Sequence, residues 1–230
     1  MLEISVIIIS VLSLICLKIL LNINFKTMKQ FDKRGSEELK SLAEKFPKDE
    51  DICKTILIKL NNESVKISIL PEYNSCLYTI FNNTIIIGKF KQAYMKIQTI
   101  AHECLHSIQN KRNLWCNFIF TNLYLLYFAA ITILTFLNKL PYTEIHMLVL
   151  IFLSIIQYVL RNYLEDDASM KARTLAKEYI EENTILTKEE EQTLLKEYDE
   201  VNKIVIPFMS YYTISMNIVK IMLYAFIALV

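Results

Sequence analysis

The segment IQTIAHECLHSIQ, residues 97–109, holds two of the chain's three histidines, four residues apart, with a glutamate directly after the first. On a helix of 3.6 residues per turn, this spacing brings the imidazoles of His102 and His106 within reach of one ion. Glu103 lies beside them and could take a proton from a water molecule at that ion. The pattern predicts a zinc site for hydrolysis; the alternative is two solvent-facing histidines on a surface helix.

A catalytic zinc normally has three protein ligands and one open position, so a third ligand is needed. The acidic run in RNYLEDDASMKARTLA, residues 161–176, offers Glu165, Asp166 and Asp167 at the start of an apparently helical stretch. The position of this run is equally compatible with a ligand and with a solvated charge cluster in which Arg161 pairs with Glu165.

Two helical regions are predicted around the motif. Residues 36–61 read as a helix broken near Pro47, with Ser36 as a possible N-cap. A second helix, residues 91–111, carries the two histidines, and its apolar side chains form one stripe suited to burial against a sheet. This stripe consists of Tyr94, Ile97, Ala101, Cys104, Leu105 and Ile108. Cys104 is therefore expected to be a small buried residue and not a metal ligand.

A small sheet is predicted just before the histidine helix. Residues 65–70 alternate as a strand, and residues 77–81 and 84–88 flank Asn82-Asn83, which is a hairpin signal. Zincin-like sites commonly hold an extended substrate along a sheet edge, and strand 84–88 is the candidate edge, unless it is an ordinary core strand.

The composition predicts a membrane protein. Hydrophobic residues make up 53% of 230 residues, and the chain has only 2 Gly and 4 Pro, which favours long helices. Four stretches are long and apolar enough to cross a bilayer: residues 4–23, 115–137, 143–160 and 204–230. The first lacks a cleavage site and a basic start, so we expect a retained anchor and not a signal peptide. The predicted fold class is mainly α, an integral membrane protein with about four transmembrane helices and a small α+β domain.

The polar pieces between these spans, residues 24–114 and 161–203, are separated by two spans and must share one side of the membrane. Most basic residues that flank the spans belong to these pieces, so the positive-inside rule places both in the cytoplasm and both termini outside. These residues are Lys26, Lys29, Lys33, Arg34, Lys111, Arg112, Arg161, Lys171 and Arg173. His146 lies in the third span, and this topology excludes it as a ligand.

Charge and cysteine content exclude two other classes. The formal net charge is +1, so no basic excess indicates a nucleic-acid partner. The five cysteines are scattered and form no CxxC motif, which favours free thiols in a reducing compartment over a disulfide framework.

The order of these features resembles a known family. HECLHSIQ, a two-span hairpin, LEDDAS and a last span are similar to the bacterial membrane zinc metallopeptidases of the YugP type, whose motifs look like HEVGHAIQ and EFDAS. The resemblance covers essentially the whole chain. It implies a zincin-like, gluzincin-type domain on the cytoplasmic side, more distantly similar to the HtpX and CAAX prenyl endopeptidases.

The resemblance also implies roles for individual residues. Glu165 would be the third zinc ligand, and Asp167 would support or orient the site behind it. Asp166 departs from the family, which has an apolar residue there, and Leu105 stands where the family usually has Gly. Gln109 matches the final glutamine of the family motif and could hydrogen-bond a neighbouring loop or simply lie on the helix surface.

The function expected from the sequence is a zinc-dependent endopeptidase at the lipid bilayer, with Glu103 as general base and membrane proteins or peptides as substrates. One alternative is a catalytically inactive membrane scaffold with a structural metal, although such sites typically have four Cys or His ligands. Another is a metal-binding transporter component, for which ionisable residues deep in several spans are expected; only His146 and Lys220 are in reach.

Overall fold

The computed structural model describes residues 1–27, 37–90 and 92–230, and the chain divides into two compact units. The helical unit comprises residues 1–23, 115–163 and 206–230, and the mixed unit comprises residues 24–114 and 164–205. Outside the described residues lie Lys29, Lys33, Arg34 and Ser36, which are named above, and Lys91, the first residue of the predicted histidine helix.

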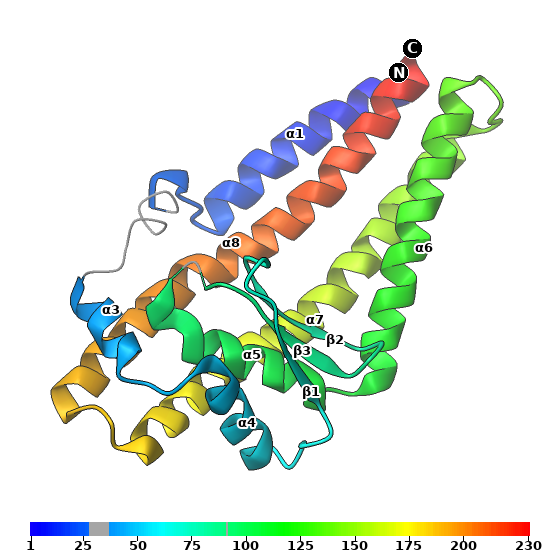
Figure 1. Cartoon of the computed structure of the whole chain (residues 1–230). Helices are drawn as coiled ribbons and strands as arrows, with labels where there is room; N and C mark the ends of the chain where they lie inside the picture. Colours follow the sequence, from blue (N-terminus) through cyan, green and yellow to red (C-terminus); the bar gives the residue numbers. More distant parts are fainter. Residues whose placement is uncertain (28–36, 91) are drawn as a thin grey trace. The chain divides into compact units, whose positions relative to one another are not determined.

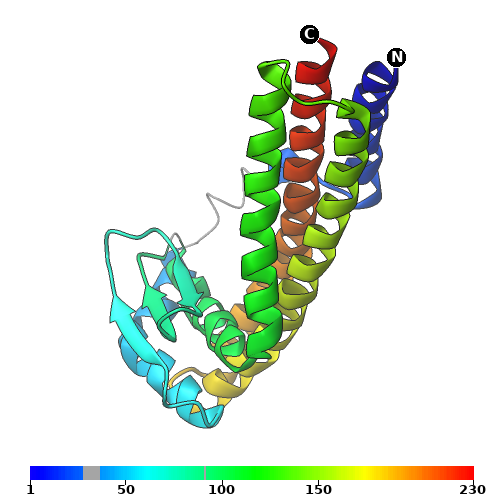
Figure 2. The same ribbon diagram turned by 90° about the vertical axis from the view of Figure 1, so that its right-hand side faces the viewer.

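The helical unit is built from parts of four long helices that run side by side (Figure 2). They are α1 (Leu2–Leu20), α6 (Lys111–Phe136), α7 (Thr143–Asn183) and α8 (Lys188–Leu229). Buried side chains of α6, α7 and α8 form its core, and α1 packs Val6 and Ile7 against it. All four helices are long and apolar enough to cross a membrane, so a membrane protein is plausible.

The last two helices are much longer than the spans predicted within them. Helix α7 has 41 residues and α8 has 42, so the predicted spans 143–160 and 204–230 are only their apolar parts. Residues 161–183 and 188–203 contain neither Gly nor Pro, and helix formation therefore continues into these polar segments. Pro207 lies inside α8 without ending it.

Asparagines end several of these helices in place of glycine. Asn22, Asn61 and Asn138 follow α1, α4 (Asp49–Lys59 in the mixed unit) and α6 with φ of 51°, 52° and 54°. In each case the next backbone N–H donates to a carbonyl five residues earlier, as from Ile23 to Lys18 at 2.9 Å. With only two glycines in the chain, asparagine is the residue that best tolerates this left-handed conformation.

The helices of the mixed unit agree in part with prediction. Helices α3 (Glu37–Glu44) and α4 (Asp49–Lys59) confirm the break near Pro47. The histidine helix is shorter than predicted: a 3-10 turn, η1 (Ala93–Met95), precedes α5 (Lys96–Ile108). The extended backbone of Gln92 and Gln109 interrupts the helix before Ala93 and after Ile108, so α5 ends before Lys111, where α6 begins.

The sheet has three strands, β1 (Lys66–Ile69), β2 (Cys76–Thr79) and β3 (Thr84–Ile87), in the order β1-β3-β2 (Figure 1). Strands β2 and β3 pair antiparallel, which confirms the predicted hairpin, and Asn83 takes a positive φ of 49° in its turn. Strand β1 pairs parallel to β3 on the other side. Of the two interpretations of residues 84–88, the core strand is confirmed and the sheet edge is wrong, because β3 is hydrogen-bonded on both sides.

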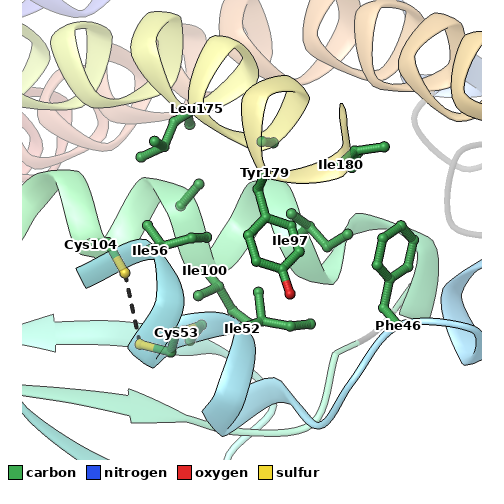
Figure 3. Close-up of a cluster of buried hydrophobic side chains, with 14 of the residues drawn as sticks. Phe46, Ile52, Cys53, Ile56, Ile97, Ile100, Cys104, Leu175, Tyr179 and Ile180 are labelled. Carbon is green, nitrogen blue, oxygen red and sulfur yellow. Dashed lines mark hydrogen bonds between the residues drawn. The ribbon is translucent and has the colours of Figure 1, made fainter. Parts of the chain in front are cut away.

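The core of the mixed unit lies between α4, α5, the sheet and the polar part of α7 (Figure 3). Ile56 and Ile100 are fully buried in it. Cys104 is buried as expected, with its Sγ 3.7 Å from the Sγ of Cys53. The predicted stripe is buried from Tyr94 to Leu105, but Ile108, the last residue of α5, is 46% exposed.

Candidate metal centre

Three side chains of the mixed unit meet at one point, two from α5 and one from α7. The Nε2 atoms of His102 and His106 are 3.0 Å apart, and a carboxylate oxygen of Glu165 lies 3.4 Å and 3.7 Å from them. The ligand atoms of all three lie within 4.8 Å of one another, and the side chains are half-buried. This group could hold a metal ion.

The packing of α7 explains how Glu165 reaches the histidines. Leu164, Ala168 and Ala172 recur at helical spacing and are buried in the core of the mixed unit. Two of the three are alanines, and such small side chains let a helix backbone approach its neighbour closely. Glu165 follows Leu164 directly and therefore lies at the border of this buried face, half-exposed and close to α5.

Gln109 connects the two helices through its side-chain amide. Its Nε2 donates to the backbone carbonyl of Leu164 at 2.8 Å, and a carbonyl can only accept, which fixes the orientation of the amide. The amide oxygen then faces Nδ1 of His106 at 2.9 Å. Nδ1 must therefore carry the proton, and neutral His106 keeps the lone pair of Nε2 free for a metal.

Asp167 touches the site through Gln109. One of its carboxylate oxygens accepts from Nε2 of Gln109 at 3.2 Å, and the other pairs with Lys171, one turn later on α7, at 2.5 Å. The hydrogen bond from Lys171 is the main reason why the pKa of Asp167 lies below its usual value. Asp167 is therefore ionised at neutral pH. It accepts a hydrogen bond from the Gln109 amide, whose oxygen faces Nδ1 of His106.

Glu103 points from α5 toward the sheet. It is only 7% exposed, and one of its carboxylate oxygens accepts the backbone N–H of Tyr78 in β2 at 2.7 Å. Burial raises its pKa above the usual value, although His102 and His106 oppose this shift. A carboxylate with a raised pKa is better matched to proton transfer near neutral pH than an exposed one.

The other titratable groups of the centre support each other's charged forms. Burial disfavours charge on His106, but the carboxylates of Glu165 and Glu103 favour the protonated imidazole and outweigh it, so the pKa of His106 lies above the usual value. Burial likewise opposes ionisation of Glu165, but the imidazoles of His102 and His106, 3.4 Å and 3.7 Å away, leave its pKa well below its usual range. Protons and a metal ion would therefore compete for the histidine nitrogens.

The donor set fits a divalent metal ion of borderline character. Two imidazole nitrogens and one carboxylate oxygen converge, and three protein ligands leave a position for water or substrate. Closed structural sites instead use four Cys or His ligands, and no Cys joins this group in residues 1–27, 37–90 and 92–230.

Several predicted site residues are thus brought together, and others are not. His102, His106 and Glu165 form the group, while Asp166 stands outside it. His146 belongs to the helical unit, where its Nδ1 lies 2.9 Å from the hydroxyl of Tyr127.

Sequence reasoning missed two backbone contacts of the site. The backbone N–H of Tyr78 donates to Glu103, and the backbone carbonyl of Leu164 accepts from Gln109. Backbone groups like these are present at nearly every position, whatever the side chain. No sequence signal could have singled them out. The match of Gln109 to the family motif was the one available signal for its contact with His106.

Comparison with protein-family models, curated proteins and solved structures gave no match to this chain. The resemblance to YugP-type metallopeptidases therefore stays a prediction.

Proposed function

We propose that this chain is a membrane-embedded zinc-dependent metalloendopeptidase that cleaves membrane proteins or peptides. The observation that carries the proposal is the group of His102, His106 and Glu165, with the buried Glu103 next to His102 on α5. Metal-assisted hydrolysis requires side chains that bind the metal and a group that accepts a proton from water, and a carboxylate with a raised pKa suits the second role.

Each residue of the centre has a role in this proposal. His102, His106 and Glu165 would hold the ion, and Gln109 would keep Nε2 of His106 available for it. When bound, zinc supplies Lewis acidity toward a scissile carbonyl and lowers the pKa of water. Glu103 would accept the proton of the attacking water and pass it to the leaving amine. The N–H of Tyr78 would keep the Glu103 carboxylate in place.

Zinc is the metal that we favour. Two imidazoles and a carboxylate with one open position are typical of catalytic zinc in hydrolases. Calcium and magnesium prefer all-oxygen sites, and softer metals prefer thiolates. The buried thiols of Cys53 and Cys104 contact each other and are not part of the group.

Membrane proteins are the proposed substrate class. Four helices are apolar enough to span a bilayer, and most of the basic residues that flank them belong to the two polar pieces. By the positive-inside rule, the candidate centre would face the cytoplasm of a bacterial cell. Juxtamembrane segments and cytoplasmic tails are the peptides that such a site meets most often.

Strand β2 replaces β3 as the candidate strand for an extended substrate. It is an edge strand of the sheet, and an edge presents backbone groups that another strand can use. Tyr78 of this strand contacts Glu103, so a peptide paired with β2 would lie beside the proposed general base.

The resemblance of HECLHSIQ and LEDDAS to the YugP-type motifs is a further support for this proposal. The two alternatives, an inactive scaffold and a metal-binding transporter component, need neither a general base nor an open ligand position. Activity measurements on a Glu103 variant therefore separate the proposal from both.

The first experiment measures zinc per chain in detergent-purified protein after dialysis against excess zinc. We expect about one zinc in the wild type, loss in Glu165→Gln and retention in Asp166→Asn. Asp166→Asn is the matched control, because it removes a neighbouring carboxylate on the same helix. The absence of zinc from the wild type would overturn the proposal.

The second experiment measures hydrolysis of a mixed fluorogenic peptide pool by wild type and Glu103→Gln. The glutamine oxygen can still accept from Tyr78, so the fold and the zinc should be kept. We expect activity to fall by about 10²- to 10⁴-fold with zinc retained. Equal activity of the two proteins, or none in either across all peptides and pH values, would favour the scaffold or transporter.

A further inference from the structure

The helical unit contains a positive charge in the middle of its apolar helices. Lys220 lies on α8, nine residues before its end at Leu229 and sixteen residues after Ile204, where the apolar run begins. At 1.5 Å per residue these separations are about 14 Å and 24 Å along the helix. A lysine at the end of a span can extend to the membrane surface, but Lys220 is too far inside.

The ammonium group of Lys220 is directed into the helical unit. It lies 4.7 Å from the centre of the Tyr124 ring on α6 and 3.4 Å from the amide oxygen of Asn217 on its own helix. Asn217 in turn donates to the side chain of Gln157 on α7 at 2.8 Å. The cation therefore lies over an aromatic face at the meeting point of three helices.

These contacts leave the charge uncompensated. Among the residues that the structure describes, no carboxylate pairs with Lys220, and its one hydrogen bond is long. The hydroxyl of Tyr124 is buried and also has no hydrogen-bond partner in the described part of the chain. An unpaired ammonium and an unpaired hydroxyl in an apolar setting both favour an additional, acceptor-bearing ligand.

Within the helical unit, all of whose residues the structure describes, no acid lies at this level. The helical unit contains two acidic residues, Glu3 and Glu144. Glu144 lies thirteen residues before Gln157 on α7, about 20 Å along the helix. Glu3 is bonded to the N-terminal amine at the start of α1. A second copy of the chain would therefore have no carboxylate at the depth of Lys220.

We propose that Lys220, with Tyr124 and Asn217, is a recognition site for an acidic side chain inside a membrane-spanning helix of a partner protein. Lipid phosphates lie at the surface of a hydrocarbon core about 30 Å thick, whereas an Asp or Glu in a span can lie at any depth. The exposed Met216 and Leu223 are one turn to either side of Lys220 on α8 and give an apolar helix a surface to pack on.

This inference rests on the membrane placement of the helical unit and not on the metal centre. Full-length protein is reconstituted in phosphatidylcholine vesicles with a donor fluorophore. The probe is an acceptor-labelled leucine-rich peptide of about 21 residues with one central Glu, and the matched peptide carries Gln there. Energy transfer between the two fluorophores reports the association. Glu103→Gln protein is measured in parallel, so that hydrolysis of the peptide cannot affect the result.

We expect the wild type to bind the Glu peptide about tenfold more tightly than the Gln peptide. The preference should disappear in Lys220→Met, persist in Lys220→Arg and persist in Lys139→Met, which removes a charge from the turn between α6 and α7. The circular-dichroism spectrum and the thermal melt of Lys220→Met, compared with the wild type, show that the chain is folded. Equal binding of the two peptides by the wild type, or a preference that survives in Lys220→Met, would overturn the proposal.

A further measurement distinguishes a lipid phosphate from a protein carboxylate as the ligand of Lys220. Adding phosphatidylglycerol to the vesicles should leave the Glu preference unchanged. Loss of the preference with phosphatidylglycerol, in a manner that depends on Lys220, would assign the site to anionic lipid and reject the partner helix.

Discussion

The helical unit and the mixed unit differ in where their polar and apolar side chains lie. In the mixed unit, large apolar residues such as Ile56 and Ile100 are fully buried. In the helical unit many are exposed, with Leu126 at 66% and Phe152 at 63%. Exposure of this kind is costly in water and favourable in lipid.

The two units also differ in how they satisfy buried polar groups. Among the described residues, four buried side-chain atoms have no hydrogen-bond partner, and all belong to the helical unit: those of Asn117, Tyr124, Thr132 and Ser215. The polar groups around the candidate metal centre instead form a connected network from Lys171 through Asp167 and Gln109 to His106. Polar residues therefore have different surroundings in the two units. In the mixed unit they orient the side chains of the candidate site, and in the helical unit four of them have a buried atom without a partner among the described residues.

The strongest test of this difference compares the histidines of the two units. Replacing His102 or His106 with Ala should remove a ligand and weaken zinc binding by more than about 10²-fold, the upper range for residues behind the ligands. His146→Ala is the matched control and should retain about one zinc per chain. Zinc titration with a competing chelator measures all three. Zinc lost equally in His146→Ala would place the metal elsewhere.

The next effect concerns the core of the mixed unit. Ile56→Ala on α4 removes a fully buried side chain and should lower the free energy of unfolding by about 2–5 kcal/mol. Ile58→Ala, on the same helix but 56% exposed, should cost much less. Denaturant unfolding of the zinc-free protein, followed by a probe in the mixed unit, gives both values. Similar losses would contradict the described core.

Gln109 tests whether the network orients the metal site. Gln109→Leu removes the acceptor of the His106 proton and should weaken zinc binding by about 10- to 100-fold. Gln98→Leu is the control, because Gln98 lies on the same helix but pairs with Asn202. That variant should change stability and leave zinc affinity near the wild-type value. Unchanged zinc affinity in Gln109→Leu would show that His106 needs no such orientation.

A smaller effect is expected for a hydrogen bond between helices of the helical unit. Asn217→Leu removes the bonds to Ser154 and Gln157 and should destabilise the protein in detergent by about 0.6–2 kcal/mol. The zinc content should not change, which distinguishes a local defect from general misfolding. An increase in stability would show that the free-energy cost of burying this amide exceeds the stabilisation from its hydrogen bonds.

The smallest effect is expected for the exposed pair of Arg173 and Asp199. The two side chains form a bidentate contact at 2.8 Å and 2.9 Å between α7 and α8, but Asp199 is about half exposed. Asp199→Asn should cost at most about 1 kcal/mol, and less in high salt. Arg173 lowers the pKa of Asp199, so the contribution is present above the unfolded value of 3.8 and is lost as the pH falls through the folded value. Thermal melts between pH 3 and 7 check this sign.

Local sequence patterns predicted which elements exist and which residues can do chemistry. Four long apolar runs, the break near Pro47 and the Asn82-Asn83 turn were all predicted and are present. These features depend on local preferences, hydrophobicity and helical period, which are properties of neighbouring residues. The spacing of His102 and His106 placed both on one side of a helix for the same reason.

How these elements meet follows from long-range packing and could not be predicted from local patterns. Position in the sequence left ligand and charge cluster equally open for Glu165, and the packing of α7 on α5 brings it to the histidines. The order of the strands made β2, and not β3, the edge. The link from Gln109 to Leu164 and the link from Glu103 to Tyr78 join segments 55 and 25 residues apart. Such contacts depend on long-range packing and backbone groups, which residue types alone do not specify.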